Sequence, residues 1–139
     1  MSVEENKATL RRFIEQWDAG NLDIVDELVA ADFVFHRPDI EDIRGRDGMK
    51  EYGRQIHAAF ANLEHIFEDL VTEGDKIAFR FRITALHKGE FMGIPPTNKE
   101  VKFTATGIVK FKNEMLAEEW VDMDALGLLQ QLGIVKLPK

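Results

Sequence analysis

The clearest candidates for chemistry are acidic side chains around the second tryptophan. If residues 115–124 form one extended strand, alternate side chains share a face. One face then carries Leu116, Glu118, Trp120, Asp122 and Asp124, and the other carries Met115, Ala117, Glu119, Val121 and Met123. A carboxylate in an apolar hollow has a raised pKa and can act as a general base. The alternatives are that these acids are solvated at the strand end and that Asp124 caps the terminal helix.

Two of the four histidines are further candidates. His87 continues a predicted inward strand face that also carries Ile77, Phe79, Phe81 and Ile83. A titratable group on an apolar face has either a hydrogen-bond partner or a role in binding, and the sequence leaves both open. His36 ends an apolar segment and is either a pocket residue or a loop residue at the rim. We interpret His57 and His65 as structural or solvated.

Several classes of site are absent from the sequence. It contains no GxSxG, P-loop, GxGxxG after a strand, or HExxH. The histidines are not spaced as metal ligands, so we expect no metal site. The chain also has no cysteine, which excludes disulfides and thiolate nucleophiles.

Charge and hydropathy narrow the possible partners. The 139 residues include 18 Lys plus Arg and 25 Asp plus Glu, so the formal net charge of −7 argues against nucleic acid. The polar start MSVEENKATL is unlike a signal peptide, and no apolar run approaches the length of a membrane span. We therefore expect one cytoplasmic domain over residues 1–139, with no membrane partner.

The spacing of apolar residues, which predicts the helices and strands that position these side chains, changes midway along the chain. Helical spacing of apolar residues predicts helices over about 2–18, 22–29 and 47–60. From about Ile66 the period becomes two, which predicts antiparallel strands with one covered face, and a short helix closes the chain. The pattern indicates an α+β fold with the helices on the apolar face of a strongly curved sheet. Such a sheet encloses a conical hollow for a small ligand.

The connection over residues 89–98 combines turn-forming residues with apolar ones. Its apolar members are Phe91, Met92 and Ile94. An apolar loop between two strands predicts a lid, a dimer contact or a hairpin loop folded onto the rim.

Three segments resemble the SnoaL-like polyketide cyclases, also called ester cyclases, within the NTF2-like superfamily. The segments are DFVFHRP, ALHKGEFMGIPPTNKEV and EEWVDMDALGLLQQLG. The resemblance extends from about Asn6 to Gly133. The sequence departs from the family pattern at Arg37, where an acidic residue is common, at Asn98, where Gly is usual, and at Ala61, where Pro is common.

The resemblance implies a cone-shaped α+β barrel that dimerises through its outer sheet face. It also implies an intramolecular aldol cyclisation driven by a pocket acid, without a cofactor. Asp124 stands at the position of that acid, and His87 and His36 stand at the positions of two recurrent histidines.

Two classes of function follow for a small apolar or carbonyl-containing ligand. The first is an enzyme acting on a carbon acid, in which Asp124 removes a proton and His87 hydrogen-bonds the enolate oxygen. The outcome is cyclisation or a ketosteroid-isomerase-like isomerisation. The second is a non-catalytic, dimeric ligand-binding protein. The predicted pocket residues are His36, Trp120, Glu118, Phe79, Phe81, Phe91 and Trp17.

Overall fold

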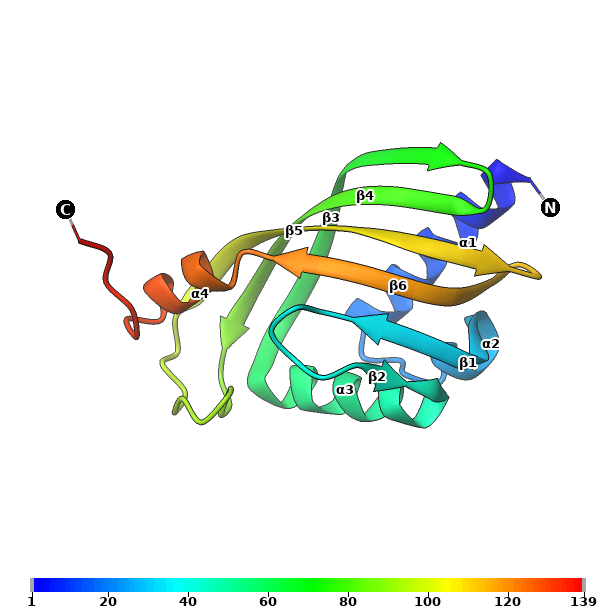
Figure 1. Cartoon of the computed structure of the whole chain (residues 1–139). Helices are drawn as coiled ribbons and strands as arrows, with labels where there is room; N and C mark the ends of the chain where they lie inside the picture. Colours follow the sequence, from blue (N-terminus) through cyan, green and yellow to red (C-terminus); the bar gives the residue numbers. More distant parts are fainter. Residues whose placement is uncertain (1, 139) are drawn as a thin grey trace.

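The computed structural model describes residues 2–138, and its strands form one curved sheet (Figure 1). The helices in this range are α1 (Val3–Asp18), α2 (Ile24–Leu28), α3 (Gly45–Ala59) and α4 (Ala125–Gln131). The strands are β1 (Val29–His36), β2 (Ile43–Arg44), β3 (Phe60–Glu73), β4 (Lys76–His87), β5 (Glu100–Lys112) and β6 (Met115–Met123).

The first helix forms as its sequence predicts. The Ser2 hydroxyl accepts a hydrogen bond from the Glu5 amide at 3.0 Å and donates one to the Glu5 carboxylate at 3.0 Å. This reciprocal pair satisfies a backbone donor that the first helical turn leaves free. The buried face of α1 carries Leu10, Phe13, Ile14 and Trp17. α1 is therefore anchored against the interior from its first turn to its last.

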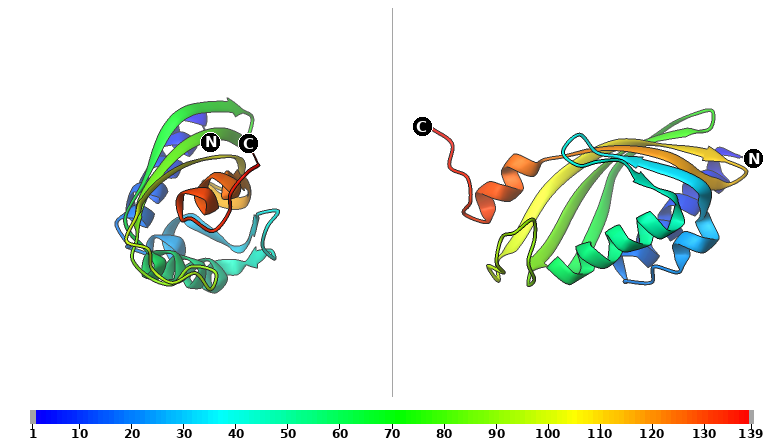
Figure 2. Two further views of the ribbon diagram at one scale, coloured as in Figure 1. Left: turned by 90° about the vertical axis from the view of Figure 1, so that its left-hand side faces the viewer. Right: turned by 60° about the horizontal axis from the view of Figure 1, so that its bottom comes forward.

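The sheet has the order β2-β1-β6-β5-β4-β3. β1 and β6 are parallel, and every other neighbouring pair is antiparallel. Figure 2 shows α1 and α3 along the concave side of the sheet, with α4 across one open end. The predicted α+β cone, with N-terminal helices on a mainly antiparallel curved sheet, is confirmed.

An extra residue in β6 reverses the alternation of its side chains. Lys110 of β5 pairs with Glu118, but the next residue, Phe111, pairs with Leu116, so Ala117 is unpaired. Such a β-bulge inserts one residue into a period of two. Leu116 and Glu119 therefore both face the interior, with 0% and 6% of their surface exposed.

β3 is also longer than its sequence pattern indicates, since it begins at Phe60 rather than near Ile66. Its pairing with β4 shifts register between Ala61 and Glu64, and Asn62 has a positive φ of 55° at that point. The strand then places His65 directly opposite Ile83.

No helix within residues 2–138 is long and apolar enough to cross a membrane.

Candidate functional site

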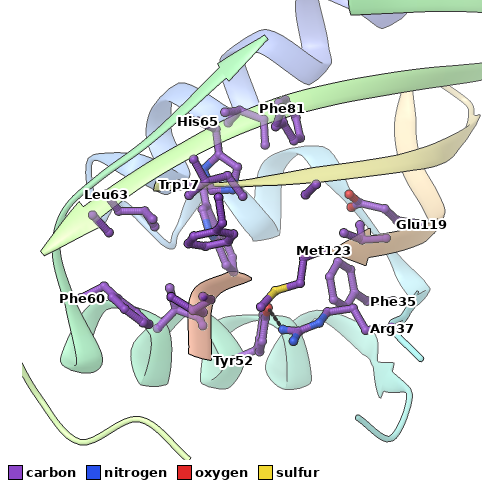
Figure 3. Close-up of a pocket in the computed structure, with 18 of the residues that line it drawn as sticks. Trp17, Phe35, Arg37, Tyr52, Phe60, Leu63, His65, Phe81, Glu119 and Met123 are labelled. Carbon is purple, nitrogen blue, oxygen red and sulfur yellow. Dashed lines mark hydrogen bonds between the residues drawn. The ribbon is translucent and has the colours of Figure 1, made fainter. Parts of the chain in front are cut away.

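The concave side of the sheet and the helices enclose an apolar cavity of about 110 Å³ (Figure 3). Its wall comes from α1, α3, α4 and five strands, with Phe91 from the β4–β5 loop. The apolar lining residues are Phe13, Ile14, Trp17, Phe35, Met49, Ile56, Phe60, Leu63, Phe81, Ile83, Ala85, Phe91, Phe103, Ala105, Val121, Met123 and Leu128. Such a wall favours a ligand with a largely apolar body.

Four polar or charged side chains interrupt this apolar lining. They are Arg37, Tyr52, His65 and Glu119, and Figure 3 shows all four around the cavity. Each comes from a different part of the chain: the end of β1, α3, β3 and β6. Only the folded sheet and helix α3 bring them together, so these four groups determine the chemistry available to a ligand.

Glu119 is the most strongly perturbed of the four. Its carboxyl group is buried, and burial alone raises its pKa from 4.5 to about 8. A charged carboxylate without a compensating partner is costly in an apolar interior, so the group takes up a proton instead. At neutral pH the cavity wall therefore carries a carboxylic acid that can donate a hydrogen bond.

Arg37 and Tyr52 form a hydrogen-bonded pair in the same cavity. The Arg37 guanidinium donates to the Tyr52 hydroxyl oxygen at 2.8 Å and makes two bonds, at 3.1 and 2.6 Å, to Asp39. Burial raises the pKa of Tyr52, so its hydroxyl stays protonated. Because its oxygen accepts from Arg37, its own proton is available to another acceptor.

His65 is held by the carboxylate of Asp18 at the end of α1. Asp18 accepts one hydrogen bond from the His65 backbone amide and one from the ring nitrogen Nδ1, both at 2.7 Å. Both side chains are mostly buried, with 15% and 14% exposure. An ionised carboxylate only accepts hydrogen bonds, so Nδ1 is the donor to Asp18, and this contact selects the neutral tautomer in which Nε2 carries the lone pair.

The prediction that Asp124 and Trp120 face the cavity is wrong. The bulge at Ala117 turns Glu119, Val121 and Met123 inward and places Trp120 on the outer face. The Asp124 side chain caps α4 by accepting a hydrogen bond from the Gly127 amide at 2.9 Å, and the residue is exposed. The helix-capping alternative therefore describes Asp124 correctly.

His36 and Glu118 also lie outside the cavity, on the outer sheet face. The His36 ring bonds Glu118 at 2.7 Å and Asp42 at 2.9 Å, and it stacks on Trp120 with ring centroids 5.4 Å apart. Parallel pairing of β1 with β6 aligns His36 with Trp120. The hydrogen bond that the His36 ring donates to the Glu118 carboxylate raises the pKa of His36.

His87 points inward as expected but does not reach the cavity. It is fully buried, and its Nδ1 accepts hydrogen bonds from the Thr97 amide at 3.2 Å and the Thr97 hydroxyl at 3.0 Å. The rings of Phe60 and Phe91, which do line the cavity, pack beside it. His87 therefore anchors the β4–β5 loop, in which Asn98 has a positive φ of 58°.

The remaining predicted pocket residues are aromatic. Trp17, Phe81 and Phe91 line the cavity. Phe91 also shows that the 89–98 loop contributes to the cavity wall. Phe79 lies deeper in the core, with its ring centroid 4.6 Å from that of Phe81.

The sequence pattern does not single out the four polar cavity residues, and the reason differs for each. Glu119 has the wrong parity without the bulge, and Tyr52 is part of an apolar helical stripe. His65 falls before the region of clear alternation. Arg37 is the one with a usable signal, because it continues the alternation of Phe33 and Phe35.

The fold and the cavity define a class of protein: an NTF2-like α+β cone with an apolar cavity in its interior. Within residues 2–138 no group of His, Asp and Glu side chains is arranged to hold a metal ion. The model of the SnoaL-like polyketide cyclase family matches residues 7–132. The chain belongs to this family.

Several solved structures share the whole fold. TsrD from Streptomyces laurentii is 25% identical, with 97% of this chain and 99% of that chain covered and a TM-score of 0.87. AclR from Streptomyces galilaeus, a proposed hydroxylase, is 27% identical, with 99% and 91% covered and a TM-score of 0.86. IdmH from Streptomyces antibioticus, a proposed polyketide cyclase, is 29% identical, with 92% and 98% covered and a TM-score of 0.79. Among curated proteins, none matches this chain.

Proposed function

We propose that this protein is an enzyme that performs cofactor-independent acid/base chemistry on a carbonyl compound bound in the cavity. The observation that carries the proposal is Glu119, a buried carboxyl group whose pKa is raised to about 8 in an apolar wall. Strongly perturbed titratable groups in enclosed cavities are characteristic of catalytic sites. Membership of the SnoaL-like polyketide cyclase family supports the same class of reaction.

Glu119 and Tyr52 act as donors to the carbonyl oxygen. With a pKa of about 8, roughly nine-tenths of Glu119 is protonated at pH 7, so it donates rather than accepts. Tyr52, polarised by Arg37 at 2.8 Å, supplies a second O–H. A hydrogen-bond donor at the carbonyl oxygen stabilises the negative charge that develops there when an enolate forms. A neutral carboxylic acid cannot also remove the α-proton, so a separate proton acceptor is needed.

The specific reaction that we propose is an intramolecular aldol cyclisation. The enolate carbon attacks a second carbonyl carbon of the same molecule, a carbon–carbon bond forms, and the resulting alkoxide takes back the proton. The apolar wall keeps water from quenching the enolate. The same donors also serve an isomerase, in which the enolate is protonated at another carbon. Analysis of the product distinguishes the two.

The proposal is tested with 2-tetralone, a bicyclic ketone with an acidic α-C–H bond. Exchange of its α-protons in D₂O, followed by NMR, should be faster with the protein than with buffer alone. Glu119→Gln removes the acid and should slow protein-dependent exchange about tenfold or more. Glu118→Gln changes the neighbouring carboxylate on the outer face and should leave the exchange rate unchanged. Binding of 2-tetralone without any exchange would favour a non-catalytic ligand-binding protein.

We also propose that two copies associate through the outer face of the sheet. Ile108 and Trp120 are cross-strand partners on this face, with 43% and 37% of their surface exposed. Adjacent exposed apolar side chains are typical of an interaction surface. A twofold axis through this face would bring the same side chains of both copies together.

A further inference from the structure

We infer that His65, held by Asp18, is the group that accepts the α-proton of the substrate. This inference rests on the proposed function, because it supplies the proton acceptor that the neutral Glu119 cannot be. It concerns the lone pair on Nε2 of His65 and the two hydrogen bonds that His65 donates to Asp18, which assign the ring proton to Nδ1.

The position of His65 follows from the register of the sheet. Residues directly opposite each other in an antiparallel pair point to the same side. His65 is opposite Ile83, and both line the cavity. Its ring also packs edge-on against Phe81, with centroids 5.2 Å apart. Figure 3 shows His65 at the cavity wall between Phe81 and Trp17. The imidazole is therefore placed where an apolar ligand would lie.

The tautomer of the His65 ring follows from Asp18. Its two carboxylate oxygens are used separately, one by the His65 backbone amide and one by Nδ1. This double contact determines both the ring orientation and the tautomer, so Nε2 is the basic nitrogen. Asp18 is thus a positioning residue, and it also stabilises the imidazolium that forms when Nε2 takes a proton.

The cavity then contains one group that removes the α-proton and other groups that stabilise the enolate oxygen. The α-proton moves to Nε2 of His65, and the C–H electron pair forms the carbon–carbon double bond of the enolate. The carbonyl electrons move onto the oxygen, where Glu119 and Tyr52 donate hydrogen bonds. After carbon–carbon bond formation, the imidazolium returns its proton to the new alkoxide. Every proton removed is returned, and no oxidant or cofactor is required.

The test uses 2-naphthol, a flat apolar phenol that becomes a strong acid when excited by light. In a dry cavity it emits as naphtholate only when a base is within hydrogen-bond reach. We expect naphthol bound to the wild-type protein to emit chiefly as naphtholate. In His65→Gln, which removes the basic nitrogen, the ratio of naphtholate to neutral emission should fall about fivefold or more.

Asp18→Asn provides a matched test of the positioning residue. An asparagine amide can donate to Nδ1, which moves the ring proton to Nε2 and removes the free lone pair from the cavity. The emission ratio should fall as in His65→Gln, and ¹⁵N spectra of His65 should show the change of tautomer. The control is His57→Gln, since His57 contacts the Trp17 carbonyl oxygen and does not line the cavity. Its emission ratio should match the wild type.

The outcomes separate this inference from the proposed function. An unchanged ratio in His65→Gln, or a ratio lost only in Glu119→Gln, overturns the role of His65 but leaves the acid/base chemistry intact. Failure of the wild type to bind 2-naphthol contradicts the ligand cavity, and both proposals fall with it. If His65→Gln does not fold, the wild-type spectra still decide: a proton on Nε2 of His65 contradicts the inference.

Discussion

Glu119 should make the stability of the fold decrease as pH rises from 5 to 8. Burial raises the pKa of this carboxyl group from 4.5 to about 8. At pH values between 4.5 and about 8, the Glu119 carboxyl group holds a proton in the folded protein and has released it in the unfolded chain. The free energy of unfolding therefore falls with rising pH. Each full pH unit contributes about 1.4 kcal/mol, and titration at both ends limits the total between pH 5 and pH 8 to about 3.5 kcal/mol.

The assay is urea unfolding of wild type and Glu119→Gln at several pH values between 5 and 8. Gln keeps the shape of the side chain but does not ionise. The free energy of unfolding of Glu119→Gln minus that of the wild type should therefore increase by about 3.5 kcal/mol between pH 5 and pH 8. Other titrating groups are common to both proteins and cancel in the difference. Glu64→Gln, which changes an exposed carboxylate on β3, is the control and should show no such gain.

Parallel stability curves for wild type and Glu119→Gln would refute this reasoning. They would show that Glu119 titrates in the folded protein as it does in the unfolded chain. A carboxylate that is ionised at pH 7 cannot donate a hydrogen bond to a carbonyl oxygen. The proposed role of Glu119 as an acid would then be lost, whatever the exchange assay showed.

Two further predictions concern Asp124, which follows β6, and Ile108, on the outer face of the sheet. Asp124→Ala removes the side-chain cap of α4 and should cost about 1 kcal/mol of stability, measured by urea unfolding, while 2-tetralone exchange stays unchanged. Slower exchange in a folded Asp124→Ala protein would restore Asp124 as a catalytic candidate. Ile108→Glu should shift the wild-type dimer to monomer in sedimentation equilibrium at micromolar concentration, whereas Leu126→Glu, on α4, should not. A monomeric wild type would contradict the proposed interface.

The sequence alone determines the features that depend on near neighbours along the chain. The spacing of Ser2 and Glu5 predicts the cap of α1, and the apolar stripe ending at Trp17 predicts its buried face. The change from helical to twofold period predicts the α+β fold, because side-chain geometry within one helix or strand has a fixed repeat. The capping role of Asp124 is also local, since its partner is three residues away.

Only the tertiary structure decides which polar groups meet in the cavity. The bulge at Ala117 is a property of the pairing between β5 and β6, whose register shifts by one residue. The alternation of residues within β6 does not show that one residue is unpaired. The bulge reverses which acids face inward, so Glu119 enters the cavity and Trp120 leaves it. Asp18 and His65 are 47 positions apart and meet because α1 packs against the start of β3. Such contacts depend on how separate elements pack, which local periodicity does not encode.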